Sequence, residues 1–548
     1  MTTAPQEAEN PLLNITDLID YAAVRPEHVM PAVKKLAADL EKALSRVTAP
    51  ETPATWDAVV VPLEEASLAF SRSWGAIGHL QSVVDTPALR DAFNEALPLA
   101  TDLYLRISQD EALYKKYLGI EKSDAFEALS PVRQRIIRRE IRDFELSGAA
   151  LPKDKRERVK AIGQELSQLS QKFSENLLDA TNAFELILPD ESRLAGVPAE
   201  TLALYRASAK AAGKTGLRLT LQFPSYLPAM KYCADRGIRE ALYYAFSTRA
   251  AEFDDGKYDN TPIIRRILEL RREEAELLGF KNFGELSLAT KMAKDPAEVL
   301  AFLRDLAKRS RPRALEDAGE VDDFAKKTLG IDEVEPWDRP YAAEKLREAR
   351  YSYSDAEVKR YFTQNAVFAG LFRMVETLFG IEIEEKRASV WHPDVKYFEV
   401  KRSGQLIAAF YADLYAREGK RSGAWMDGER TRRRLPDGKL VTPVAYLVTN
   451  FAAPVEGREA TMTHDEVTTL FHEFGHTLHH ILTAQEEAQV SGINGVEWDA
   501  VELPSQFLEN FAWEHDVVKA ISRHADTGES LPDELFKKMI AAKNFEAG

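Results

Sequence analysis

Apolar residues recur at spacings of three and four along most of the chain, the period of an amphipathic α-helix. The clearest case is the segment 156–187, where a single apolar stripe is flanked by Glu, Lys and Gln. Its members are Val159, Ile162, Leu166, Leu169, Phe173, Leu177, Ala180 and Phe184. The pattern predicts one long structural helix packed along this stripe.

Two further helices carry start and stop signals. Thr261 and Pro262 suit an N-cap and a first turn, and Gly279 suits the end of the same helix. Asp295, followed three positions later by Glu298, predicts another helix start.

Few segments have the alternating pattern of a strand. Apolar residues alternate over 217–223, and a hairpin is predicted at 396–412 with its turn at Ser403–Gly404. The run 441–451 is also extended, and Pro443 restricts it to a sheet edge or a strand start. The predicted fold class is mostly α, with one small sheet.

The best break in composition follows the long helix. Residues 188–200 (LPDESRLAGVPAE) are rich in Pro, Gly and charged residues. We therefore predict an N-terminal helical region over 1–200 and a second region over 201–548.

Composition narrows the class of protein. The 548 residues include 72 Lys and Arg against 88 Asp and Glu, a net charge of −16, which argues against nucleic-acid binding. No segment reaches the roughly 18 to 20 apolar residues of a membrane span, and the first fourteen residues lack the basic and apolar parts of a signal peptide. Cys233 is the only cysteine, so no intrachain disulfide can form. We expect a cytoplasmic monomer without membrane contact.

The clustering of histidines is the first indication of a chemical site. Five of the ten histidines fall within 464–480, around the sequence His472-Glu473-Phe474-Gly475-His476. Helical apolar spacing and a capping box of Thr463 and Glu466 predict that this segment is a helix. Residues four apart share a helix face, so His472 and His476 can hold one tetrahedral zinc. Glu473 can then act as the base that takes a proton from the attacking water.

The alternative is a set of surface histidines on an ordinary amphipathic helix. Gly475 argues against it, because a glycine in mid-helix costs about 1 kcal/mol and suggests that another backbone approaches closely. His479 and His480 lie on or past the next turn, and we interpret them as packing or supporting residues.

A third protein ligand must come from a later segment. Leu482 occupies the position where a third histidine would follow, which leaves carboxylates as candidates. These are Glu486, Glu487, Glu497, Asp499, Glu502 and Glu509. A chain reversal at 491–495 lets a second helix run back past the first. Spacing alone does not decide whether Asp499, Glu502 or Glu509 is the third ligand.

Four segments carry a family resemblance. They are THDEVTTLFHEFGHTLHH (463–480), VELPSQFLENF (501–511), FYADLYAREGKRSGAW (410–425) and PVAYLVTNF (443–451). Together, in this order, they resemble the thimet oligopeptidase family of zinc metallopeptidases.

The resemblance implies two mostly helical lobes around a deep substrate channel, with the zinc helix and a small β-sheet in its wall. It implies endopeptidase cleavage of short peptides, with one zinc per chain. His472, His476 and Glu502 would be the metal ligands and Glu473 the general base, while Glu509 would orient a ligand. The strand VAYLVTNF would offer its backbone to the substrate.

One departure from the family concerns its loop of Gly, Tyr and His, which follows the zinc helices and supplies donors to the reaction intermediate. The last tyrosine here is Tyr446, and we expect a C-terminally truncated sequence. A catalytically impaired peptide-binding fragment is therefore an alternative to an endopeptidase. A peptidyl-dipeptidase of the same fold is a second alternative.

Overall fold

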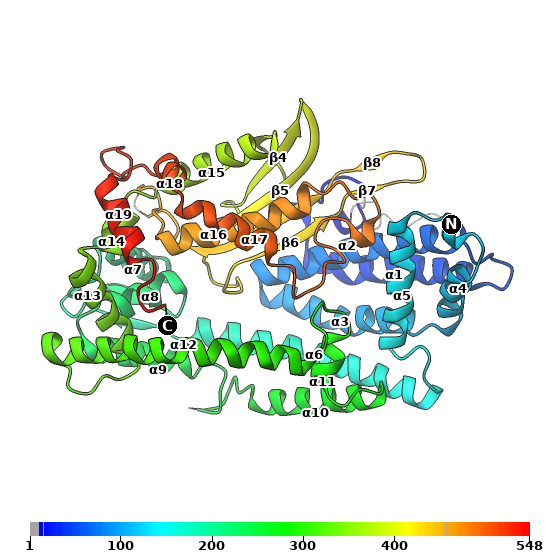
Figure 1. Ribbon diagram of the computed structural model, residues 1–548, viewed down its shortest axis with the longest axis horizontal. Helices are drawn as coiled ribbons and strands as arrows, with labels where there is room; N and C mark the ends of the chain where they lie inside the picture. Colours follow the sequence, from blue (N-terminus) through cyan, green and yellow to red (C-terminus); the bar gives the residue numbers. More distant parts are fainter. Residues whose placement is uncertain (1–9, 15, 254, 456, 548) are drawn as a thin grey trace.

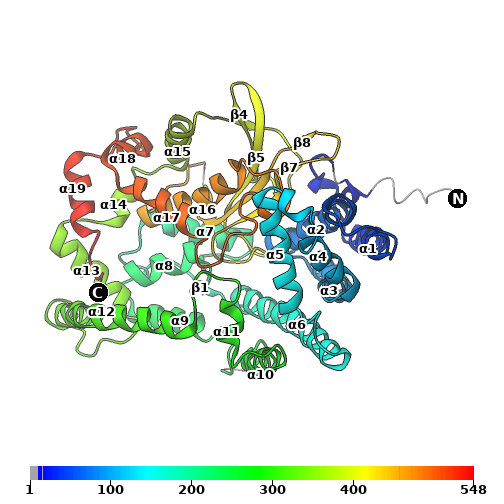
Figure 2. The ribbon, with the colours of Figure 1, turned by 45° about the vertical axis from the view of Figure 1, so that its right-hand side comes forward.

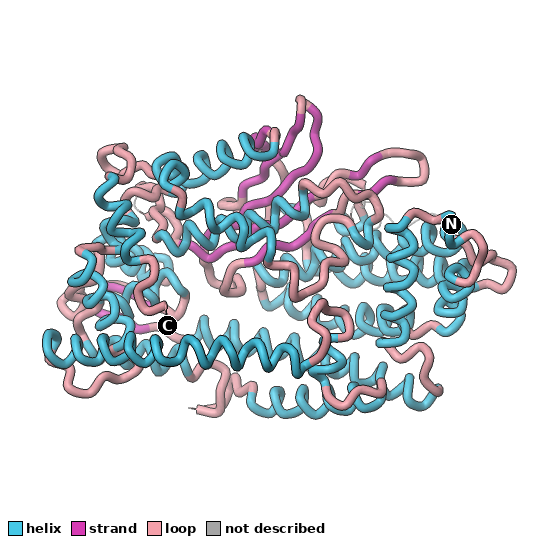
Figure 3. The backbone as a smooth tube through the Cα atoms, in the orientation of Figure 1, coloured by secondary structure: helices cyan, strands magenta, loops and turns pink. Residues whose placement is uncertain are grey.

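A computed structural model describes residues 10–14, 16–253, 255–455 and 457–547. Helices make up most of this part of the chain, and the strands gather mainly in one sheet (Figure 3). The predicted fold class is confirmed. The N-terminal helices lie at one end of the molecule and α13 and α19 at the other, with the sheet and α16 between them (Figures 1 and 2).

The N-terminal part is a set of packed helices. Their bounds are α1 (Pro26–Thr48), α2 (Val61–Val83), α3 (Pro87–Ser108), α4 (Glu111–Glu121), α5 (Pro131–Leu146) and α6 (Lys153–Ala183). The side chains of Thr86, Asp110 and Ser130 each accept the N–H of the third helical residue and so begin α3, α4 and α5. The predicted long helix is α6, which ends before Leu186–Leu188 because these residues form strand β1.

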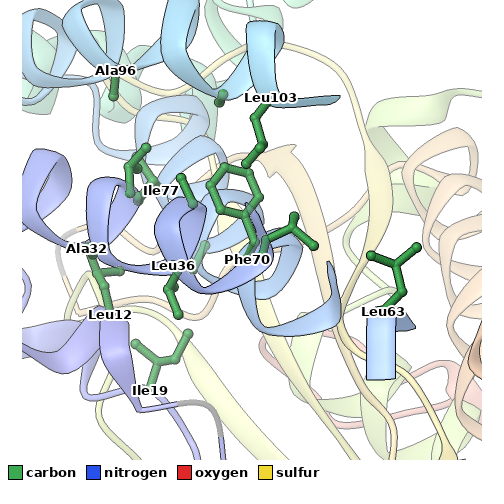
Figure 4. Packing of buried hydrophobic residues seen from close by; sticks show 14 of the residues in the cluster. Leu12, Ile19, Ala32, Leu36, Leu63, Phe70, Ile77, Ala96 and Leu103 are labelled. Carbon is green, nitrogen blue, oxygen red and sulfur yellow. The ribbon is translucent and has the colours of Figure 1, made fainter. Parts of the chain in front are cut away.

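A hydrophobic core joins α1, α2 and α3. Leu36, Phe70 and Leu103 lie within it (Figure 4), and Phe70 is 1% exposed. Each fully buried side chain of this size stabilises the fold by about 1.5–3 kcal/mol relative to exposure. The same core continues into the sheet through Tyr411 and Tyr446.

The middle of the chain is again helical. Its elements are α7 (Ala199–Ala211), β2 (Leu217–Leu219), α8 (Phe223–Tyr232), α9 (Arg236–Ser247), α10 (Thr261–Leu277), α11 (Phe283–Leu288), α12 (Pro296–Phe324), α13 (Arg339–Tyr351), α14 (Asp355–Lys359) and α15 (Gln364–Phe379).

Sequence signals placed some of these boundaries well. Asp295 caps α12 by accepting the N–H of Glu298, and Gly279 follows α10 with φ +87°, as predicted. Thr261 is the first residue of α10 rather than its cap. The strand predicted over 217–223 is wrong beyond Leu219, because Pro224 favours a helix start and α8 begins at Phe223.

The main sheet has the strand order β3-β4-β5-β9-β6. The strands are β3 (Glu382–Lys386), β4 (Lys396–Arg402), β5 (Gln405–Tyr415), β6 (Trp425–Arg430) and β9 (Val444–Phe451). β5 and β9 are parallel and the other pairs are antiparallel. The predicted hairpin turn is confirmed, with φ +51° at Ser403 and +76° at Gly404. A short hairpin of β7 (Arg433–Arg434) and β8 (Leu440–Val441) lies apart from this sheet.

Pro443 precedes β9, so the prediction of a strand start is confirmed. The expectation that this strand offers its backbone to a substrate is wrong. β9 is paired on one side with β5 and on the other with β6, and these ladders use the backbone groups that a peptide would need. Among the described strands of this sheet, β6 and β3 are the edges.

Helices cover both faces of the sheet. Tyr411 and Tyr446 face the N-terminal core, while Phe410 and Leu447 face the opposite side and pack with Phe474 of α16. The last helices are α16 (His464–Ile481), α17 (Leu503–Glu509), α18 (His515–Ile521) and α19 (Asp533–Ala542). In the described part of the chain, no helix combines the length and apolar character needed to cross a membrane.

Candidate metal centre

Helix α16 begins as the sequence predicts. Thr463 accepts the N–H of Glu466, and the Glu466 carboxylate accepts the N–H of Thr463, so the capping box is complete. The helix places His472 and His476 on one face, with ring centroids 5.0 Å apart.

Both imidazoles converge on one carboxylate oxygen. Oε2 of Glu502 lies 3.1 Å from Nε2 of His472 and 3.0 Å from Nε2 of His476. One ligand atom from each of the three residues lies within 4.8 Å of the others. The structure therefore brings together the three residues predicted to hold the metal.

The other candidate carboxylates have different partners. Asp499 accepts the N–H groups of Met292 and Ala293, and Glu497 pairs with Arg135. Glu486 pairs with Arg432 and Arg434, and Glu487 with Arg133.

Glu509 lies behind His472 rather than in front of it. Its Oε1 is 2.5 Å from Nδ1 of His472. An ionised carboxylate can only accept, so Nδ1 carries the hydrogen and Nε2 of the neutral ring keeps its lone pair. Glu509 thus orients the His472 ring so that the Nε2 lone pair points at Glu502. The family resemblance predicted this orienting role for Glu509.

The donor set suits a cation. With its hydrogen on Nδ1, the His472 ring turns the Nε2 lone pair towards a carboxylate oxygen 3.1 Å away, an arrangement that a cation between the two atoms would stabilise. Burial lowers the pKa of His476, which favours a neutral, coordinating imidazole. Burial raises the pKa of Glu502, but the hydrogen bond from Ser505 and the two imidazoles outweigh it, so its pKa is below the usual value.

Gly475 sets the distance between α16 and the segment that carries Glu502. A Cβ atom at Gly475 would lie 2.6 Å from Cα of Ser505 and 2.7 Å from the carbonyl oxygen of Pro504. The predicted close approach of a second backbone is confirmed. Only glycine allows α17 to lie close enough for Glu502 to reach both imidazoles.

Ser505 is a supporting residue that the sequence analysis missed. Its hydroxyl, fully buried, is 2.8 Å from both Oε2 and the carbonyl oxygen of Glu502. A serine three residues after an acidic residue at a helix start is a signal for such a contact. Ser505 fixes the Glu502 side chain in its orientation.

Glu473 is buried next to the cluster. Burial raises its pKa to about 7, and the negative charge of Glu502 adds to this rise. Such a carboxylate can both take and return a proton near neutral pH.

The two remaining histidines of the helix end differ. His480 is buried, its Nε2 lies 3.1 Å from the carbonyl oxygen of Arg430, and it packs closely against Gly428 and Gly492. This agrees with the predicted packing role. Burial lowers the pKa of His479.

Comparisons with known proteins agree with this geometry. The profile of peptidase family M3 matches residues 229–548, and that of the neurolysin/thimet oligopeptidase N-terminal domain matches residues 33–156. Oligopeptidase A of Salmonella typhimurium is 47% identical over 98% of this chain and 80% of its own length. The chain belongs to peptidase family M3. It is a metallopeptidase, and the predicted resemblance is confirmed.

Other relatives are less similar in sequence. The organellar oligopeptidase A of Arabidopsis thaliana is 41% identical over 99% of this chain and 70% of its own length. A dipeptidyl carboxypeptidase of Salmonella typhimurium is 32% identical over 98% of this chain and 80% of its own length. A solved oligoendopeptidase F from Bacillus anthracis superposes with a TM-score of 0.52 at 16% identity, covering 94% of this chain and 74% of that one, which shows a shared fold.

Proposed function

We propose that this chain is a zinc-dependent endopeptidase that hydrolyses short oligopeptides. One observation carries the proposal: Nε2 of His472 and Nε2 of His476 meet the same oxygen of Glu502, with the buried Glu473 alongside. Two imidazoles and one carboxylate form a donor set that catalytic zinc uses.

In this proposal, His472, His476 and Glu502 hold one zinc ion. Bound there, zinc would supply Lewis-acid chemistry, making water more acidic and polarising the scissile carbonyl. The Glu473 carboxylate takes a proton from the attacking water and returns it to the departing amine. Glu509 and Ser505 keep His472 and Glu502 in their orientations.

The comparisons support endopeptidase rather than peptidyl-dipeptidase activity. The chain is 47% identical to an oligopeptidase A and 32% identical to a dipeptidyl carboxypeptidase. A peptide blocked at its carboxyl end separates the two activities, because an endopeptidase cleaves it and a dipeptidyl carboxypeptidase does not.

The general-base role is tested by Glu473→Gln, which keeps the shape of the side chain and removes its basicity. We expect zinc content to stay at the parent level and peptide hydrolysis to fall by about 10²–10⁴-fold. Glu514→Gln is the matched control, because Glu514 is exposed and lies outside the cluster. Hydrolysis by Glu473→Gln at the parent rate would exclude Glu473 as the base.

A further inference from the structure

A large cavity opens beside the metal centre. Its volume is about 780 Å³, within the range of small-ligand sites, and Thr469 and Asp465 of α16 form part of its wall. These residues precede His472 by three and seven positions, so they lie on the same helix face. Thr469 is about 4.5 Å from His472 along the helix axis, at 1.5 Å per residue. The cavity therefore continues the surface that carries the metal ligands.

Strand β6 starts at the same cavity. Gly423 and Ala424, immediately before β6, line it together with the first turns of α16. The other end of β6 lies beside the end of α16, where the carbonyl oxygen of Arg430 is 3.1 Å from Nε2 of His480. β6 and α16 thus run side by side in the same direction, and His472 and His476 fall between the two ends.

The outer edge of β6 has no strand partner among the described residues, since β6 pairs only with β9. An extended peptide can add to such an edge through main-chain hydrogen bonds. Antiparallel pairing is the more stable arrangement. A peptide that pairs antiparallel to β6 runs, from its amino to its carboxyl end, from Arg430 towards Trp425. Its carboxyl-terminal part therefore enters the cavity.

Part of the cavity wall is apolar. Phe223 and Leu227 of α8 line it and are 46% and 40% exposed, although both are large hydrophobic residues. Their spacing of four places them on one face of α8. Leu204 of α7 and Phe451 at the end of β9 extend the same surface.

We propose that this cavity binds the part of the substrate on the carboxyl side of the scissile bond, and that Phe223 and Leu227 select apolar side chains there. The inference rests on the proposed function, because the metal centre defines where the bond is cut. The occupant is an extended peptide segment with a leucine or aromatic side chain, which continues from the edge of β6.

A crosslinking experiment tests the direction without relying on turnover. Two peptides of the same length carry benzoylphenylalanine near the carboxyl end or near the amino end, and each is irradiated with the zinc-loaded Glu473→Gln variant. We expect the carboxyl-end probe to crosslink to residues 223–228, as read by mass spectrometry. Crosslinking of this segment by the amino-end probe, or by neither probe, would overturn the proposal.

Leu227→Ser tests the apolar selection. We expect the dissociation constant of a peptide with leucine in its carboxyl-terminal part to rise about fivefold to tenfold, and that of the matching serine peptide to stay the same. Leu268→Ser on α10 is the control, because Leu268 is exposed but does not line the cavity. An unchanged preference for leucine in Leu227→Ser would contradict the proposal.

Zinc content and peptide cleavage of the parent are measured on the same preparation. Absence of both would refute the proposed function, whereas zinc binding and cleavage with the wrong crosslinks would refute only the assignment of the cavity.

Discussion

At the scale of single residues, three carboxylates of the site differ in their properties because their surroundings differ. Burial raises the pKa of Glu473 to about 7, so this group can exchange a proton near neutral pH. Glu502 receives a hydrogen bond from Ser505 and faces two imidazoles, which favour its ionised form. Glu509 accepts from Nδ1 of His472 and determines which nitrogen of that ring is free. We infer a base, a metal ligand and a positioning residue, respectively.

His79 is buried against the face of the sheet opposite α16, and it makes stability depend on pH. It stacks on Tyr446 with centroids 3.7 Å apart, and burial lowers its pKa to about 3. The unfolded chain binds a proton on His79 below about pH 6.5, while the folded chain stays neutral there. Its contribution is therefore fully present above pH 6.5 and is lost as the pH falls towards 3.

Unfolding by denaturant at pH 6 and pH 4.5 checks this prediction. The parent should lose up to about 1.4 kcal/mol per pH unit more than His79→Phe, because the variant lacks the titrating group. Equal losses in the two proteins would show that His79 is protonated in the folded state.

At the scale of elements, the packing of α17 on α16 builds the centre. Gly475→Ala should push the two helices apart, because its Cβ would lie 2.6 Å from Cα of Ser505. We expect a loss of about 1–3 kcal/mol in the free energy of unfolding and weaker zinc binding. Gly319→Ala is the matched control, since Gly319 lies within α12 with no atom near its Cβ position. That change should stabilise the protein by about 0.5–1 kcal/mol. A fully stable, zinc-loaded Gly475→Ala variant would contradict this account.

Local signals in the sequence predicted most elements. The remaining features depend on pairing between segments that are distant in the sequence, which local signals do not report. The stripe of α6, the capping box of α16 and the turn at Ser403–Gly404 each depend on neighbouring residues, so they could be recognised. The place of β9 inside the sheet could not, because it depends on β6, which precedes it by a long connection.

The same limit applies to the site. The spacing of His472 and His476 predicted two converging imidazoles. The choice among Asp499, Glu502 and Glu509 depends on how α17 lies against α16, and spacing left it open. The support from Ser505 became visible only in the structure.

At the scale of the whole molecule, the sheet links the two halves. One face of the sheet packs into the N-terminal core through Tyr411 and Tyr446, and the other face packs against α16. The N-terminal helices thereby support the sheet on which the metal helix rests. The predicted boundary near residue 200 falls between the two segments matched by family profiles and stays a prediction. The cytoplasmic location and the monomeric state stay predictions as well.

The most direct test of the central claim is the zinc content of the purified chain after dialysis, measured by elemental analysis. Glu502→Ala and Glu497→Ala are compared with the parent, because Glu497 is a nearby carboxylate whose partner is Arg135 at the surface. We predict one zinc per chain in the parent and in Glu497→Ala, and far less in Glu502→Ala. No zinc in the parent, or equal zinc in all three proteins, would contradict the assignment of His472, His476 and Glu502 as the metal centre.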